Sequence, residues 1–241
     1  ERMGYYPTDE PVVEIIRTYL KPPSERGRLF DPCAGEGKAA SSLGNALNCE
    51  TWGVELSPER AGKAQNVMDK VFQAPWQACV LSDESISWLY LNPPYDFDRF
   101  EGQKRLEWDF LKTTSSKLMR GGLLTYIIPQ KILGMIEVAR LLAGHYEAIT
   151  VYRFPDGLYE KFKQVVVLAS KRKLYQLPTD KEILSLQSLA STELEPIHPA
   201  VEPIYELLPA PLRGANGKPV MFKRTDWEPE EVVEATKEAG V

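Results

Sequence analysis

The tetrapeptide Asn92-Pro93-Pro94-Tyr95 has the side chains and carbonyl groups needed for chemistry on an amine. Proline fixes φ and removes the backbone N–H, so the Asn92 side-chain oxygen and the Pro93 carbonyl can converge as two acceptors on one amino group. Tyr95 adds an aromatic face on which a planar base or amide can stack. We therefore predict that these four residues are catalytic; the simpler alternative is a proline turn that ends a strand.

Residues 31–37 form a second candidate site, a turn with two glycines. Gly35 and Gly37 let the backbone turn sharply after a strand and let a ligand approach without meeting a Cβ atom. Glu55 ends the next short strand, where a carboxylate can accept hydrogen bonds from both hydroxyls of a ribose. Together these features predict a nucleoside site, although the glycine spacing alone also fits a dinucleotide-binding fold.

Apolar, strand-like stretches alternate with helix-like stretches over most of the chain. The strand-like ranges are 27–32, 51–55, 86–91, 123–128, 148–154 and 165–170, and the helix-like ranges are 12–20, 38–47, 106–119 and 132–144, with a further helix after Ser57 as its N-cap. This alternation predicts an α/β fold with a Rossmann-like, doubly wound and mostly parallel sheet. Both candidate sites follow strands, so we expect them at the carboxyl edge of the sheet.

The composition changes near residue 173. Residues 174–241 hold eight of the 19 prolines and few periodic apolar stretches. We predict that residues 1–173 form the catalytic domain and that residues 174–241 form a Pro-rich C-terminal arm, or the start of a segment that is cut short, with a short helix at 228–241. Because the chain begins with Glu1, we expect a trimmed chain or an ordered fragment.

The overall composition excludes several classes of protein. Hydrophobic residues make up 43% of the 241 residues and charged residues 26%, and no apolar run approaches the roughly 20 residues that span a bilayer. We therefore expect a cytoplasmic globular protein with no membrane partner. Cysteines 33, 49 and 79 lack metal-ligand spacing, and His145 and His198 lie outside the motifs, so we predict no disulfide and no metal site.

Charge is distributed unevenly along the chain. The formal net charge of −5 argues against a polyanionic partner, but residues 101–173 carry 13 basic and 7 acidic side chains, a net of +6 between two acidic flanks. A basic segment of this kind is typical of a surface that faces a polyanion such as nucleic acid. The alternative is a solvated face of mixed charge.

The motifs Asp31-Pro32-x-x-Gly35-x-Gly37, Glu55 and Asn92-Pro93-Pro94-Tyr95, in this order, resemble those of class I S-adenosylmethionine-dependent methyltransferases, in particular the N6-adenine methyltransferases of the gamma arrangement. The opening segment, 4–8, resembles the part that these enzymes close over the methionine end of the cofactor. The resemblance covers residues 4 to about 173. It implies the class I methyltransferase fold and S-adenosylmethionine as the cofactor. The cofactor contacts that it implies are Tyr6, Thr8, Asp31, Pro32, Cys33, Ala34, Gly35, Gly37, Glu55 and Leu56. A third cofactor motif is left open between Gln73 and Asp83.

The resemblance also implies direct methyl transfer to the exocyclic N6 amino group of adenine, most readily in DNA, with the base flipped out of the duplex. Acceptance of both N–H protons by Asn92 and the Pro93 carbonyl would favour an available lone pair on the nitrogen, so no His or Cys base is required. Tyr95 would stack on one face of the base, and Phe162, or else Tyr159, on the other; packing against neighbouring strands is the alternative for these two rings. Predicted phosphate contacts are Arg99, Lys104, Arg105, Lys161 and Lys163.

Three other functions stay open at this point. A protein glutamine methyltransferase of the release-factor type would use the same tetrapeptide on a side-chain amide, and an RNA adenine methyltransferase would share the pocket. A cofactor-binding subunit without catalysis would have no need of an intact tetrapeptide at 92–95. No target-recognition domain is apparent, so we expect either a separate recognition subunit or a missing C-terminal region to supply it.

Overall fold

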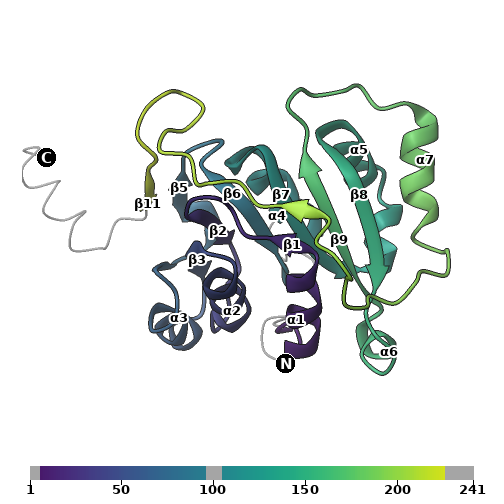
Figure 1. The fold of residues 1–241 in the computed structure, drawn as a ribbon, viewed down its shortest axis with the longest axis horizontal. Coiled ribbons are helices and arrows are strands. Elements are labelled where there is room, and N and C mark those ends of the chain that lie inside the picture. The colour runs from purple at the N-terminus through teal and green to yellow at the C-terminus, as the bar shows by residue number, and fades with distance from the viewer. Residues whose placement is uncertain (1–5, 96–104, 226–241) are drawn as a thin grey trace, which may run out of the picture.

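A twisted sheet forms the centre of the molecule (Figure 1). The computed structural model describes residues 6–95 and 105–225, and in them seven strands follow the order β4-β3-β2-β6-β7-β9-β8. These strands are β2 (Gly27–Asp31), β3 (Cys49–Glu55), β4 (Lys70–Gln73), β6 (Ile86–Leu91), β7 (Leu118–Pro129), β8 (Tyr146–Arg153) and β9 (Gln164–Lys171). Strand β9 runs antiparallel to both of its neighbours, and the other pairs are parallel. The predicted mostly parallel, Rossmann-like α/β fold is confirmed.

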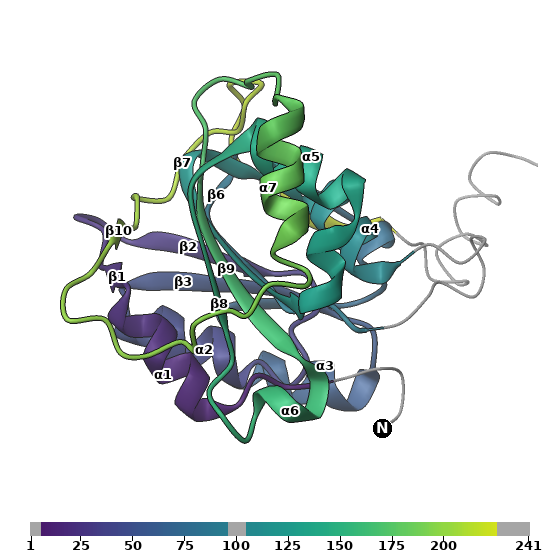
Figure 2. The ribbon, with the colours of Figure 1, turned by 90° about the vertical axis from the view of Figure 1, so that its right-hand side faces the viewer.

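Helices cover both faces of this sheet (Figures 1 and 2). One layer holds α1 (Glu10–Thr18), α2 (Lys38–Ala46) and α3 (Pro58–Gln65), and the other holds α4 (Leu106–Thr114) and α5 (Ile136–His145). A single turn, α6 (Tyr159–Phe162), separates β8 from β9. Ser57 caps α3 as expected, because its hydroxyl accepts a hydrogen bond from the Arg60 N–H at 3.5 Å.

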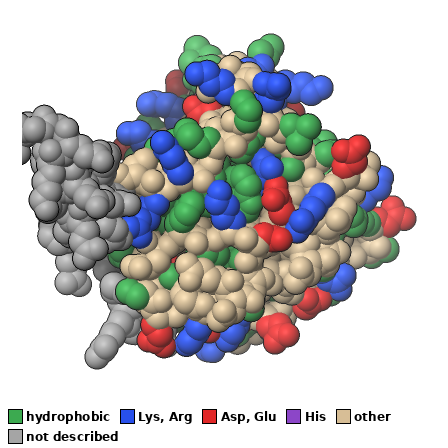
Figure 3. All heavy atoms as spheres, turned by 90° about the vertical axis from the view of Figure 1, so that its left-hand side faces the viewer, with side chains coloured by type: hydrophobic (Ala, Val, Ile, Leu, Met, Phe, Trp, Pro, Cys, Tyr) green, Lys and Arg blue, Asp and Glu red, His purple; other side chains and the backbone are tan. Residues whose placement is uncertain are grey.

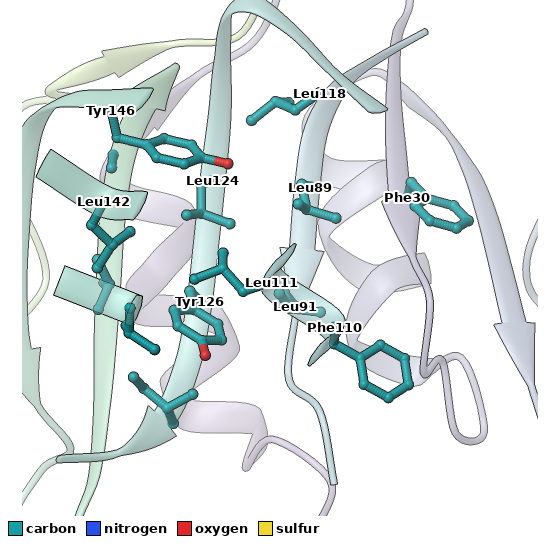
Figure 4. Packing of buried hydrophobic residues seen from close by; sticks show 14 of the residues in the cluster. Phe30, Leu89, Leu91, Phe110, Leu111, Leu118, Leu124, Tyr126, Leu142 and Tyr146 are labelled. Carbon is teal, nitrogen blue, oxygen red and sulfur yellow. The ribbon is translucent and has the colours of Figure 1, made fainter. Parts of the chain in front are cut away.

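Side chains that alternate along the strands build two hydrophobic cores. Phe30 and Leu89 belong to one cluster and their neighbours Leu29 and Trp88 to the other, and all four are fully buried. Figure 4 shows the first cluster, between the sheet and the α4 and α5 layer. Because successive strand residues point to opposite faces, a sheet that is covered on both faces requires nearly continuous apolar strands. This requirement explains why the central strands were recognisable in the sequence.

The expected helix over 106–119 is too long. Helix α4 ends at Thr114, a short 3₁₀ turn follows, and β7 begins at Leu118. The Thr114 hydroxyl donates to the Phe110 carbonyl at 2.6 Å, and Ser115 and Ser116 come directly after it. Threonine and serine side chains compete with the helix backbone for hydrogen bonds, so the helix stops where they accumulate.

The segment that follows β9 wraps around the domain (Figures 1 and 2). Helix α7 (Asp180–Ser188) begins with a capping box between Thr179 and Glu182 and packs against α5. Two short strands follow: β10 (Tyr205–Glu206) pairs with β1 (Leu20–Lys21), and β11 (Phe222–Arg224) pairs with β5 (Cys79–Leu81). The described part of the predicted arm therefore has a helix and strands of its own. The helix expected at 228–241 lies outside the described residues.

The face of the molecule that carries β11 is mixed in charge. Figure 3 shows basic and acidic side chains side by side on this face, without a continuous basic surface. Within residues 6–95 and 105–225, no helix has the length and hydrophobicity needed to cross a membrane. The same described residues contain no cluster of three or more His, Cys, Asp or Glu side chains that would hold a metal ion.

Candidate functional site

The two candidate motifs meet at the carboxyl edge of the sheet. Strand β2 lies between β3 and β6 and is parallel to both, so the chain leaves β2 toward one side and later returns on the other. In open α/β sheets, ligands bind in the crevice at such a reversal of strand order. The Cys33 thiol, in the turn after β2, donates to the Asn92 carbonyl after β6 at 3.2 Å. This contact joins the glycine turn directly to the tetrapeptide at 92–95.

Hydrogen bonds fix the orientation of the Asn92 side chain. Its Nδ2 group donates to the Tyr6 carbonyl at 3.0 Å and to Thr8 Oγ1 at 3.1 Å, and its Oδ1 atom accepts from the Tyr95 hydroxyl at 2.8 Å. A carbonyl oxygen can only accept, so the NH₂ group must face Tyr6 and the oxygen must face Tyr95. A side-chain carbonyl oxygen has two lone pairs, which leaves one on Oδ1 for a substrate amine.

The Tyr95 hydroxyl stays protonated. Burial raises the pKa of Tyr95 well above its ordinary value of 10.0. The hydroxyl accepts a hydrogen bond from Gln164 Nε2 at 2.6 Å and donates one to Asn92 Oδ1. Tyr95 therefore orients the Asn92 amide through its hydroxyl and also lines the neighbouring cavity.

The glycine turn is shaped around the end of β2. Gly35 and Gly37 have φ angles of 57° and 77°, in the region that favours glycine. A Cβ atom on Gly37 would lie 2.9 Å from the sulfur of Met68 and 3.1 Å from Cα of Ala64, so a side chain is excluded there. The Gly35 N–H donates to Glu55 Oε2 at 2.9 Å, which ties the turn to the end of β3.

Glu55 stands at the predicted position and is anchored on both carboxylate oxygens. Its Oε1 atom accepts from the Ser57 N–H at 2.8 Å and from the Arg60 guanidinium at 2.7 Å, and the residue is 5% exposed. The Arg60 Nε group also donates to Oε1, at 3.0 Å, so that Oε1 has three donors. Each carboxylate oxygen has two lone pairs and Oε2 accepts only from Gly35 among these contacts, which leaves one position on Oε2 for a ribose hydroxyl. The next side chain, Leu56, is 54% exposed and presents an apolar surface beside Glu55.

Asp31 is a buried acid next to this turn. One of its oxygens accepts from the Cys33 N–H at 3.0 Å, and the residue is 4% exposed. Burial raises the pKa of Asp31 from 3.8 to about 7, and the charge of Glu55 adds to the effect. The carboxyl is therefore poised between its neutral and ionised forms near neutral pH.

The two candidates for the third cofactor motif lie at opposite edges of the sheet. Gln73 ends β4 and is paired in register with Glu55, so it stands at the carboxyl edge. Asp83 lies before the amino end of β6, where its carboxylate contacts Lys117 Nζ at 2.6 Å. Position alone favours Gln73.

A cavity of about 410 Å³ opens beside the tetrapeptide. It is lined by Tyr6, Tyr95, Arg105, Pro129, Gln130, Lys131, Tyr159, Phe162, Lys163 and Ala190. The Tyr6 ring stacks on Tyr95 with centroids 5.5 Å apart and contacts Phe162 at 4.4 Å. A planar ligand that stacks between Tyr95 and Phe162 would take the place of this ring. The structure thus gathers the aromatic side chains predicted for the substrate side, and it adds Tyr6, which was predicted to contact the cofactor.

The predicted phosphate contacts fall into three groups. Lys163 and Arg105 line the cavity, whereas Lys161 is exposed and does not line it. The Arg105 side chain is only 16% exposed and is ion-paired with Glu107, which is fully buried, so Arg105 belongs to the cavity wall. Arg99 and Lys104 lie outside the described residues.

The family now follows from comparison. A model described as "Uncharacterised methyltransferase family (DUF6094)" matches residues 1–207. The chain belongs to this methyltransferase family. No curated protein matches the sequence at a significant level.

Solved structures share the fold of this methyltransferase at low sequence identity. The EcoKI type I restriction enzyme M protein is 15% identical with a TM-score of 0.52, over 73% of this chain and 46% of that subunit. TYW2 from M. jannaschii in complex with AdoMet is 15% identical with a TM-score of 0.50, over 72% of this chain and 80% of that one. A putative methyltransferase in complex with the Haloferax volcanii Trm112 activator is 11% identical with a TM-score of 0.51, over 68% and 90%.

The candidate site contains residues that were not predicted from the sequence: Pro129, Gln130, Lys131, Gln164 and Ala190. Gln130 follows β7 directly, so the rule that ligands gather at carboxyl ends of strands would have found it. Its Nε2 group donates to the carbonyls of Leu189 and Thr192, and its Oε1 atom accepts from the Tyr159 hydroxyl. No local sequence pattern predicts Ala190 as a cavity residue, because only the packing of α7 brings it to the cavity.

Proposed function

We propose that this methyltransferase transfers a methyl group from S-adenosylmethionine to the exocyclic N6 amino group of adenine in DNA, with the target base flipped into the 410 Å³ cavity. The observation that carries the proposal is the fixed Asn92 amide, whose Oδ1 atom accepts from the hydroxyl of Tyr95, a residue that lines the cavity together with other aromatic side chains. The fold shared with a restriction-enzyme M protein supports DNA as the substrate. A separate subunit or a further region of the chain would supply target recognition.

The residues present fit S-adenosylmethionine, which supplies a methyl group already activated on a sulfonium. Glu55 Oε2 would accept from a ribose hydroxyl, and the exposed Leu56 side chain would support the adenine ring. Gly35 and Gly37 have positive φ angles, so the turn at the end of β2 would present backbone without side chains to the cofactor. Asp31 would face the cationic methionine end of the cofactor, together with Thr8.

The chain's own contribution to the reaction is to position the acceptor amine. Asn92 Oδ1 and the Pro93 carbonyl would accept its two protons, which favours an available lone pair on the nitrogen and stabilises the positive charge that develops there. Alignment of the amine with the methyl carbon supplies the rest of the rate enhancement. The proton then leaves to water, so no side-chain base is needed.

Methyl transfer from labelled S-adenosylmethionine into DNA, RNA and purified release factor tests this proposal directly. We expect label in DNA at adenine N6, detected after digestion to nucleosides. The Tyr95 and Phe162 rings that line the cavity favour a nucleobase over a side-chain amide, because an amide needs no second stacking face. Label in protein alone would overturn the proposed substrate, and no label in any acceptor would overturn the proposed activity.

Replacement of Phe162 by alanine is expected to weaken binding of the acceptor substrate. Stacking of a base on an aromatic ring is worth about 1–3 kcal/mol, so the KM for DNA should rise by about tenfold or more while kcat changes little. Steady-state kinetics would measure both constants. Tyr175→Ala is the matched control, since Tyr175 is an exposed aromatic residue outside the cavity. Equal KM values for the two variants would contradict a stacking role.

Cofactor affinity is expected to depend on pH through Asp31. Its pKa of about 7 in the free protein means that a cationic ligand must bind the ionised form, so binding releases a proton and the affinity falls as pH drops below 7. Between pH 7 and pH 5.5 the Kd should rise by roughly tenfold or more. Calorimetry in two buffers of different ionisation enthalpy would detect the released proton. In Asp31→Asn the affinity should lose this pH dependence; an unchanged profile would mean that another group titrates.

A further inference from the structure

Gln164 lies behind the tetrapeptide and is buried. It is the first residue of β9, is 4% exposed, and pairs in register with Pro129 of β7. Its Nε2 group donates to the Tyr95 hydroxyl at 2.6 Å, and Tyr95 donates in turn to Asn92 Oδ1 at 2.8 Å. Strand β7 separates β9 from β6, so this side chain reaches across the end of one strand to act on the site of the next.

The Tyr6 carbonyl determines the direction of these hydrogen bonds. At one end the Tyr6 carbonyl can only accept, which leaves Asn92 Oδ1 as an acceptor facing Tyr95. The Tyr95 hydroxyl has a single proton, which must therefore go to Asn92, and its oxygen needs a donor on the other side. Gln164 Nε2 is that donor. With an acceptor in its place, two oxygens without a shared proton would face each other across the 2.8 Å between Tyr95 and Asn92.

We propose that Gln164 is a positioning residue for methyl transfer: its Nε2 group donates to the Tyr95 hydroxyl oxygen, which keeps the Tyr95 proton directed at Asn92 and so holds Asn92 Oδ1 ready for the substrate amine. The proposal rests on the function proposed above. Gln164 does not touch the substrate; it acts through Tyr95. A buried hydroxyl without this constraint could turn its proton away, and the Asn92 oxygen would lose the bond that orients it.

The variant Gln164→Glu tests the proposal, because it keeps the shape of the side chain and reverses its hydrogen-bonding character. An ionised carboxylate can only accept hydrogen bonds, so the Tyr95 hydroxyl would donate to it instead of to Asn92. The Tyr95 oxygen would then face Asn92 Oδ1 with no proton between them. We expect kcat to fall by about 10- to 100-fold at pH 8, with the cofactor Kd unchanged. Acidification to pH 5.5 should restore most of this loss, because a protonated carboxyl donates again.

Several ionisable groups surround the introduced carboxyl. Cys33, Tyr90 and Glu107 act on Tyr95, and Arg105, Lys131 and Lys163 line the cavity beside it. The pH at which half of the kcat is recovered depends on the charges of these groups, but the recovery toward acidic pH does not. Gln164→Met removes the donor without adding a charge, so its kcat should fall without recovery in acid. Gln187→Glu is the matched control: Gln187 donates to the Gly134 carbonyl outside the site, and its variant should keep the wild-type kcat at every pH.

A second readout separates this proposal from the proposed function. Asn92 is one of five asparagines, so its side-chain NH₂ signal can be followed in protein labelled with ¹⁵N-asparagine and assigned by its loss in Asn92→Ser. Asp31 also titrates near neutral pH and is linked to Asn92 through Cys33, so the wild-type signal provides the baseline. In Gln164→Glu we expect this signal to shift with pH by more than it does in the wild type, whether or not the protein methylates the chosen acceptor. A kcat within threefold of wild type at pH 8, a loss that persists unchanged at pH 5.5, or an Asn92 signal that responds to pH in Gln164→Glu no more than in the wild type would overturn the role of Gln164.

Discussion

Replacing Asn92 with alanine is expected to lower the rate of methyl transfer by about 10²–10³-fold, the range that removal of one preorganised polar group from a catalytic site produces. The reason is the loss of the oriented Oδ1 acceptor, which no neighbouring side chain replaces in the described structure. Cofactor affinity should stay within about threefold of wild type, because the glycine turn and Glu55 are held by their own contacts. Single-turnover transfer of labelled methyl, with calorimetry for cofactor binding, measures both quantities.

The substitution also leaves the Tyr6 carbonyl and the Tyr95 hydroxyl without their partner, which costs about 1–3 kcal/mol of stability for a buried group. Thermal unfolding of Asn92→Ala must therefore accompany the kinetics. Asn66→Ala provides a control, since Asn66 caps the end of α3 away from the tetrapeptide. A variant that remains folded and transfers methyl at more than about a tenth of the wild-type rate would show that the acceptor amine is held elsewhere.

The core of the fold and the meeting of the two motifs could be predicted because both depend on local patterns. Buried parallel strands leave continuous apolar runs in the sequence, and parallel strands bring their carboxyl ends to one edge. Glu55 and Asn92, which are separated in sequence but follow neighbouring parts of the sheet, were therefore expected at the same edge. The Cys33–Asn92 contact shows how close this rule brings the glycine turn and the tetrapeptide at 92–95.

The parts that could not be predicted depend on long-range packing. Gln164 reaches Tyr95 across the end of β7, and Ala190 reaches the cavity through the docking of α7 on α5. Tyr6 is the clearest case, because its place in the motif predicts a cofactor contact, while its carbonyl orients Asn92 and its ring lies in the cavity. Such roles follow from which segments pack together, and the spacing of residues along the chain carries no signal for them.

Replacing Glu55 with alanine is expected to raise the Kd for S-adenosylmethionine by about 10- to 100-fold. A charge-assisted hydrogen bond from a ribose hydroxyl to Oε2 would be lost, and such a bond is worth about 1.5–3 kcal/mol. The change also removes the acceptor of the Gly35 N–H, so the turn that approaches the cofactor would lose its tie to β3. Calorimetric titration of S-adenosylmethionine and of its demethylated product measures this effect.

Glu50→Ala separates a binding role from a structural one, because the two glutamates occupy opposite ends of β3 and each pairs with an arginine. Glu50 accepts from Arg28 at 2.6 Å, as Glu55 accepts from Arg60 at 2.7 Å, but only Glu55 lies at the carboxyl edge. Both variants should therefore lose some stability, and only Glu55→Ala should lose cofactor affinity. Glu55→Gln, which can still accept from Gly35, should bind more tightly than Glu55→Ala and less tightly than the wild type. If Glu50→Ala weakened cofactor binding as much as Glu55→Ala, the loss of affinity would come from destabilisation of the sheet. The ribose contact would then have to lie elsewhere.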